Sequence, residues 1–285
     1  MEMVGRALAP EQHLATRTLT TSDFPSILSN VANKMLFEGY ETQEETWRIW
    51  CAPGSLPDFK PNTFAKASES DDLDEIAESD EYKYGKLTDA KETAKLATYG
   101  KLFRITRQAI INDDLGALTD IPYKHGEAAA RKIGDIAYAV LTSNPQMGDG
   151  NPLFDAAHNN IGTGGNPGET TLAEGIALMG LQKDLQGISN LNIRAQYFIA
   201  PLALEGAAET FFNSGQFAGD NKAATRANPY AGTRFTRVYD PRLDADSSKT
   251  WYLAGPKGKT IKVFFLNGEQ EPYLEEKEAW NMDGV

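Results

Sequence analysis

A chain of 285 residues can form one large domain or two modest ones, and its hydrophobic share of 41% is ordinary for a folded protein. The formal net charge of -12 argues against a dedicated nucleic-acid binder, which needs a basic face. No apolar run approaches the roughly 18 residues of a membrane span. The single cysteine, Cys51, cannot form an internal disulfide, which fits a reducing compartment.

Residues 1–45 are predicted to form an N-terminal arm. Thr21 or Ser22 can cap a helix from about Asp23 to Gly39. This helix either docks on its own domain, which is the plainer interpretation, or reaches a neighbouring subunit. The prediction rests on apolar side chains that recur along one side of the helix: Phe24, Ile27, Leu28, Val31, Met35 and Leu36.

The segment from Trp47 to Phe59 is an aromatic-rich connector. Two prolines and a glycine leave room for only a short strand around Arg48–Cys51. Cys51 has no basic neighbour that would lower the pKa of its thiol, so we expect a packed, inert cysteine.

The next stretch predicts a long two-stranded flap. Glu81–Leu87 reads as one strand, Thr98–Ile111 as the other, and the polar segment Thr88–Lys95 as the tip between them. An isolated two-stranded ribbon is marginal in water, and this one carries little apolar surface. We therefore expect the flap to lie on another copy of the same protein.

Two blocks of opposite charge accompany the flap, an acidic one from Glu69 to Glu81 and a basic one from Lys83 to Arg107. A solvated surface explains them most simply, but complementary blocks also orient overlapping subunits. The acidic run lacks the glycine and ligand spacing of an EF-hand, so no metal site is predicted there. The expected intersubunit contacts come from Glu75, Glu78, Lys83, Lys86, Lys91 and Lys95.

A long amphipathic helix follows the flap. Asn112, Asp113 and Asp114 can cap a helical turn through Leu118, and Thr119-Asp120 with Pro122 marks a second start. From there a helix of about twenty residues, roughly 30 Å long, is predicted to end at Ser143-Asn144-Pro145. Its apolar stripe consists of Ala129, Ile133, Ile136 and Val140, widened by Ala130, Ala137 and Leu141.

Residues 146–170 form a glycine-rich loop without the lysine of a phosphate-binding loop, so a plain connector is expected. His158 has no second histidine at ligand spacing, and His13 and His125 are the chain's other two. A histidine-built metal site or a Ser-His-Asp triad is therefore not predicted. We expect no catalytic residue and no cofactor.

A mixed region begins at Thr171, where Thr171 to Glu174 reads as a capping box that opens a helix to about Leu185. A strand at Asn190–Ile199, a helix from Pro201 to about Asn213 and a polar loop at 216–233 follow. This mixture of helices and strands predicts an α+β region with its own core. Its later strands are predicted at Arg234–Tyr239, Lys249–Leu253 and Thr260–Leu266.

This order of elements resembles the major capsid proteins of tailed bacteriophages, whose fold encapsulin shells share. Mu-like head proteins and capsid proteins linked to a prohead protease are the most similar in appearance. The resemblance covers roughly residues 20–285 and is carried by the order of the segments rather than by one motif. These segments are Thr98–Leu118, Leu153–Asn160, Trp251–Pro256 and Ile261–Leu274.

The resemblance implies an α+β capsid fold in four parts. These are an N-terminal arm and connector (1–57), an extended β-hairpin loop (58–112), a peripheral domain with the long spine helix (113–170 and 268–285) and an axial domain (171–267). It also implies assembly in the host bacterial cytoplasm into pentamers and hexamers of a virion shell. Such a shell encloses double-stranded DNA without specific binding, has portal and decoration proteins as further partners, and involves no membrane.

Two alternatives remain open. One is an encapsulin-like cargo shell. The other is a soluble hydrolase that uses carboxylates such as Asp113 and Asp114. Adjacent carboxylates at a helix start point in different directions, however, and helix capping explains them without catalysis.

Overall fold

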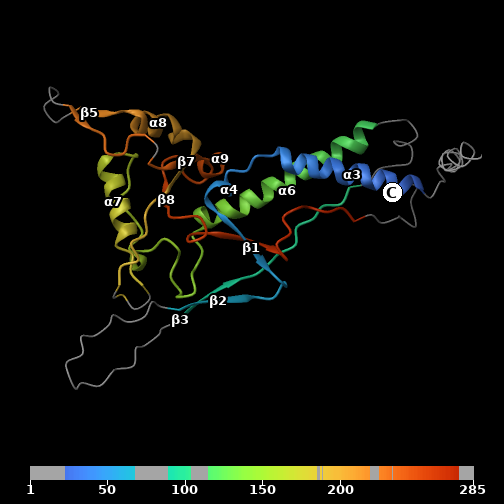
Figure 1. Ribbon diagram of the computed structural model, residues 1–285, viewed down its shortest axis with the longest axis horizontal. Helices are drawn as coiled ribbons and strands as arrows, with labels where there is room; N and C mark the ends of the chain where they lie inside the picture. Colours follow the sequence, from blue (N-terminus) through green and yellow to red (C-terminus); the bar gives the residue numbers. More distant parts are fainter. Residues whose placement is uncertain are drawn as a thin grey trace, which may run out of the picture. The chain divides into compact units, whose positions relative to one another are not determined.

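The computed structural model describes residues 23–67, 89–103, 115–184, 187, 189–218, 225–232 and 234–275 (Figure 1). The chain divides into two compact units. The first consists of Met1–Glu44, Gly100–Lys132 and Glu271–Val285, and the second of Glu45–Tyr99 and Ile133–Gln270.

In the first unit, helix α3 (Asp23–Thr42) packs against the first half of helix α6 (Leu115–Ser143) through two glycines. A Cβ on Gly39 would lie 2.1 Å from the carbonyl oxygen of Tyr123, and one on Gly126 would lie 2.0 Å from that of Leu36. The two backbones therefore approach as closely as glycine permits. The predicted arm helix is confirmed, and it docks on its own chain.

Helix α6 is continuous over 29 residues, rather than a short turn followed by a helix of twenty. Pro122 lies inside it and is fully buried. An interior proline removes one backbone hydrogen bond, a local cost that packing of the surrounding turns offsets. The expected end at Ser143 is confirmed, with Asn144 leaving the helix at a φ of 46°.

The buried face of α6 is rotated from the predicted stripe. Ile136 is 37% exposed, so its placement in the stripe was wrong, whereas Tyr138 is 1% exposed. Both lie on the helix, but only the tyrosine faces the aromatic cluster around Trp50, whose ring centroid is 5.6 Å from that of Tyr138. A large ring and its partners thus decide which side of the helix is buried.

The predicted strand at Arg48–Cys51 is wrong, because Trp47–Trp50 forms a helical turn, α4. Side chains three apart share one side of a helix but opposite faces of a strand. A helical turn therefore lets Trp47 and Trp50 enter the same core, where each is 1% exposed. Strand β1 (Ala52–Leu56) follows and pairs in parallel with β9 (Lys262–Leu266), which confirms the last predicted strand.

A two-stranded ribbon is present, but its strands are not the predicted ones. Strand β2 (Asn62–Ala67) pairs antiparallel with β3 (Asp89–Ala94), as Figure 1 shows. The supposed tip is thus a strand, and Thr98–Phe103 has no regular structure. The first expected strand, Glu81–Leu87, and residues 104–111 of the second lie outside the described residues. The sequence Asp-Ala-Lys-Glu-Thr-Ala of β3 favours helix, so pairing with β2 overrides its local preference.

A three-stranded sheet in the order β7-β4-β8 separates two cores of the second unit. It contains β7 (Thr236–Tyr239), β4 (Tyr197–Ala200) and β8 (Tyr252–Ala254). Because successive strand residues face opposite sides, Phe198 joins one core and Ile199 the other. The α6 side includes Trp47, Trp50, Cys51, Ala137, Tyr138, Leu141, Val238 and Leu243, and the opposite side Leu172, Leu204, Ala208, Phe212, Tyr230 and Phe235.

Helices cover the sheet face opposite α6. The predicted helix after Pro201 is confirmed as a 3-10 turn (Leu202–Leu204) followed by α8 (Glu205–Asn213). Helix α7 (Glu169–Gly180) starts two residues before the predicted box. The hydroxyl of Thr171 accepts from the Gly168 N–H, and Glu174 instead binds Thr163.

Three further differences complete the second unit. The expected strand at Asn190–Ile199 is reduced to β4. The expected loop at 216–233 contains an antiparallel pair, β5 (Gln216–Ala218) and β6 (Thr225–Ala227). A short helix, α9 (Pro241–Asp244), follows β7 and is capped by Asp240, whose side chain accepts from the Arg242 N–H.

Candidate assembly surface

Two of the six expected contact residues, Lys91 and Lys95, lie in the described part of the chain. Lys91 is in β3 opposite Ala65, Lys95 follows the strand, and both side chains are exposed. The two lysines are four residues apart on an extended segment, so they are separated by about 13 Å along it. The other four, Glu75, Glu78, Lys83 and Lys86, lie outside the described residues. Asp113 and Asp114 of the hydrolase alternative lie outside them as well.

Phe64 of β2 and Glu92 of β3 hold the ribbon against other parts of the second unit, to which the ribbon belongs. Phe64 and Glu92 are opposite each other in the pairing of β2 with β3, so their side chains share one face. The ring of Phe64 stacks on that of Phe264 in β9 with centroids 5.0 Å apart. Both carboxylate oxygens of Glu92 accept from the N–H of Gly148, at 3.2 and 3.1 Å.

Gly148 has no room for a side chain at this contact. A Cβ there would lie 2.0 Å from the carbonyl oxygen of Lys91. The ribbon backbone therefore rests directly on the 146–151 turn, in which Met147 N–H donates to the Asn151 carbonyl. The sequence carried no signal for this contact, because its partners are 56 residues apart.

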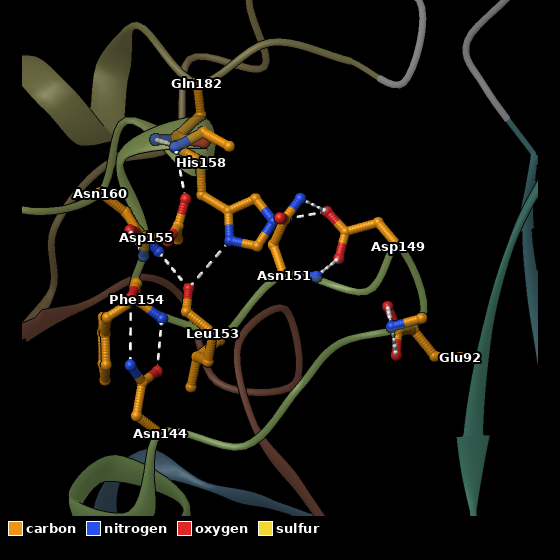
Figure 2. Close-up of polar contacts among 12 residues, drawn as sticks. Glu92, Asn144, Asp149, Asn151, Leu153, Phe154, Asp155, His158, Asn160 and Gln182 are labelled. Atoms are coloured by element: carbon orange, nitrogen blue, oxygen red, sulfur yellow. Dashed lines mark hydrogen bonds and ion pairs between the residues drawn. The ribbon is translucent and has the colours of Figure 1, made fainter.

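The loop that carries Gly148 connects α6 with α7, as expected, and it is ordered by internal polar contacts (Figure 2). The Asn144 side chain brackets Phe154, donating to its carbonyl and accepting from its N–H at 3.1 and 2.7 Å. The Leu153 carbonyl accepts from Asn160 at 2.6 Å and also faces Nδ1 of His158 at 3.1 Å. These contacts close residues 144–160 into a defined loop.

His158 and Asp149 form an ion pair at the outer part of this loop. Nε2 of His158 lies 2.7 Å from Oδ2 of Asp149, and Figure 2 shows the two side chains facing each other. The hydrogen bond to Asp149 raises the pKa of His158. The hydrogen bond from His158 and those from Asn151 lower the pKa of Asp149 to about 2.

A second charged cluster surrounds Arg242 in α9. Its guanidinium contacts Glu45 at 3.0 Å, Asp135 at 2.6 Å and Asp240 at 3.2 Å. The side chains of Glu45 and Asp240 are only 2% and 3% exposed, so this one cation neutralises carboxylates that the core would not otherwise accept. Burial raises the pKa of Glu45.

The Arg242 cluster continues into a buried hydroxyl pair. The hydroxyl of Thr46 donates to Asp240 at 2.5 Å and contacts the Tyr138 hydroxyl at 2.7 Å. Burial raises the pKa of Tyr138. These contacts join the buried hydroxyls to the Arg242 cluster, in which Oε2 of Glu45 is buried without a hydrogen bond and lies 3.0 Å from the guanidinium.

Large apolar side chains stand exposed on both units. In the first unit Leu102 is 100% exposed and Tyr273 is 73% exposed. In the second unit Leu181 is 63%, Tyr99 59% and Ile161 55% exposed. Single exposed apolar residues are normal on a folded protein, so these residues mark candidate contact positions rather than a defined patch.

The described part of the chain also shows whether it contains a metal site, a membrane-spanning helix or a reactive cysteine. No group of three or more potential metal ligands occurs among those residues. No helix among them is long and apolar enough to cross a membrane. Cys51 is fully buried, and burial raises the pKa of its thiol to about 12, as expected for an inert cysteine.

Comparison with known proteins gives one family. A family model described as phage capsid protein matches residues 90–285. No curated protein and no solved structure matches the chain. Because this match covers more than half of the 285 residues, the chain belongs to the phage capsid proteins, which are structural components of the virion and not enzymes.

Proposed function

We propose that the chain is the major shell subunit of a tailed-phage head of the Mu-like type. Copies assemble into pentamers and hexamers in the host cytoplasm and enclose double-stranded DNA. Residues 171–267 form the axial domain around each capsomer axis, and residues 113–170 and 268–285 the peripheral domain with α6 as its spine. The portal and a decoration protein are further partners of the shell.

The observation that carries this proposal is the anchored ribbon. Strands β2 and β3 pair only with each other among the described strands, and a free two-stranded ribbon is marginal in water. Phe264 and Gly148 hold the ribbon at Phe64 and Glu92, but Lys91 and Lys95 are exposed along it. A ribbon that is held at Phe64 and Glu92 and carries exposed lysines is suited to lie across a neighbouring copy.

The charge of the chain agrees with a container for DNA rather than a binder. A net charge of -12 repels the phosphate backbone, so packaged DNA does not adhere to the shell. The exposed Leu102 and Tyr273 supply apolar area that assembly can bury.

Electron microscopy of the purified protein tests the proposal. We expect closed shells with fivefold and sixfold capsomers, or capsomers that close when salt screens the acidic charge. A protein that stays monomeric under every assembly condition contradicts it. Shells that contain an enzyme and no DNA when isolated from their host indicate the cargo-shell alternative instead.

A further inference from the structure

The ring of His158 is placed between two groups that can only accept hydrogen bonds. Nε2 faces the Asp149 carboxylate at 2.7 Å, and Nδ1 faces the Leu153 carbonyl at 3.1 Å. A neutral imidazole carries one N–H and can donate to only one of them. Both contacts form together only when the ring carries two protons and a positive charge.

The surroundings of His158 favour that charge. The charged side chains that act on it among the described residues are Asp149 and Asp155, and both are acidic. From the chain beyond α7, the neutral Gln182 side chain donates to the His158 carbonyl at 3.0 Å. Glu92, which approaches the same loop from β3, is a further carboxylate. The ring itself is partly open to solvent, with a side-chain exposure of 25%.

The ion pair is connected to the ribbon through adjacent residues. Asp149 follows Gly148 directly, and Gly148 is the residue whose N–H holds Glu92. Asp149 also accepts from the N–H and the side chain of Asn151, which closes the same turn. We therefore expect a displacement of Asp149 to move the Gly148 N–H that binds Glu92 of β3. Gly148 is already in close contact with the backbone of Lys91, so such a movement also affects β3 directly.

We propose that His158 is a protonation switch for the ribbon: the doubly protonated ring holds the 146–160 loop closed and keeps β3 seated on Gly148, and loss of a proton loosens both. The neutral ring must give up either Asp149 or Leu153. Figure 2 shows all the side chains that this switch links, from Glu92 to His158.

The direction of the pH dependence follows from the two pKa shifts. The pKa of His158 is raised on folding, so its contribution is complete below the ordinary histidine value of 6.5 and is lost as pH rises through the folded value. The pKa of Asp149 is lowered to about 2, so its contribution is lost only in strong acid. The loop is thus closed in mildly acidic solution and loosens on the alkaline side.

Nuclear magnetic resonance of the full-length chain tests the ring directly. The three histidine ring signals are titrated, and the His158 signal is assigned by its absence in His158→Gln. We expect a pKa above the ordinary value and two ring protons in mildly acidic solution. A His158 that titrates at or below the ordinary value overturns the proposal, whether or not the variant folds.

Hydrogen exchange tests the link to the ribbon. Protection factors of residues 89–94 are compared at about pH 5.5 and about pH 8.5, on either side of the ordinary histidine value. We expect them to fall about tenfold at the higher pH, the size typical of one hydrogen bond to a charged group. In His158→Gln this pH dependence should vanish, whereas His125→Gln, which alters a histidine of the first unit, should retain it.

Glu92→Gln separates the two halves of the mechanism. It should weaken the ribbon at both pH values but leave the pKa of His158 raised. Ribbon protection that is independent of pH in the unaltered chain refutes the switch. These measurements do not require an assembled shell. Only the consequence, that pH regulates contacts between subunits, rests on the proposed function. If the switch is observed in a protein that never assembles, the proposed function is wrong and the switch stands.

Discussion

Arg242 shows how one residue allows several buried charges to coexist. Its guanidinium contacts Glu45, Asp135 and Asp240, and two of these three carboxylates are almost completely buried. Gly134 makes space for the cluster, since a Cβ there would lie 2.2 Å from Oε2 of Glu45. The geometry predicts a strong dependence of folding on this one side chain.

Arg242→Met should destabilise the chain by about 3 kcal/mol, near the lower end for breaking a buried pair because Arg242 is 24% exposed. Without the guanidinium, the pKa of Glu45 in the folded chain should rise further. The loss of unfolding free energy should therefore be greatest at pH values above that raised pKa, and it should shrink as pH falls toward 4.5, the ordinary value. Chemical denaturation at several pH values measures this.

Asp135→Asn provides the matched control, since this carboxylate is 55% exposed and its removal should cost no more than about 1 kcal/mol. Equal losses for the two variants would show that burial is not the cause.

Gly126 is a second residue whose role is decided by close contact. Gly126→Ala places a methyl group 2.0 Å from the Leu36 carbonyl oxygen, so α3 and α6 must separate. We expect a loss of about 2–3 kcal/mol, as for overpacked cores, measured by thermal unfolding.

Gly206→Ala in α8 meets nothing within 4 Å and should be neutral or up to about 0.5 kcal/mol stabilising. If Gly126→Ala behaves like Gly206→Ala, the two helices do not pack through glycine.

At the scale of elements, the ribbon shows where local sequence reasoning succeeds and where it does not. A polar two-stranded element in this part of the chain was expected, and one is present. Its strands were misplaced because Asp89–Ala94 consists of helix-favouring residues, and only the facing Asn62–Ala67 makes it a strand. The spine helix was predictable because its apolar residues recur over many turns.

Lys95→Glu tests the ribbon as a contact between copies. Because Lys95 is exposed, the reversal should leave the unfolding midpoint of the subunit unchanged but slow or prevent assembly, followed by light scattering. Lys249→Glu, at another exposed lysine away from the ribbon, is the control and should assemble normally. Equal assembly of both variants would remove Lys95 from the interface.

At the scale of the whole molecule, the two cores explain folding, and the proposed assembly assigns a role to the exposed apolar residues. Both cores lie in the second unit, on opposite faces of β4, and they bury most of its large aromatic rings. Leu102 of the first unit stays 100% exposed, so folding of a single chain gains nothing from its apolar surface. On the proposed function, such a residue is available for contacts between copies in the shell.

Leu102→Ser should therefore separate folding from assembly. The free energy of unfolding should change by less than about 0.5 kcal/mol, whereas assembly should require more protein. Lys101→Ser, at the neighbouring exposed position, controls for a general effect of substitution in this segment. Unchanged assembly of Leu102→Ser would place this residue outside every contact between copies.

The sequence by itself determined the class of the protein and its most periodic elements. The order of segments resembles that of phage capsid proteins, and the acidic charge argues against a dedicated nucleic-acid binder. The arm helix, the spine helix and the late strands follow from local patterns. Tertiary structure alone decided the helical turn at Trp47–Trp50, the identity of the ribbon strands and the anchor between Glu92 and Gly148. These depend on partners distant along the chain, and a local pattern does not specify which distant partner will bury a ring or bind a backbone N–H.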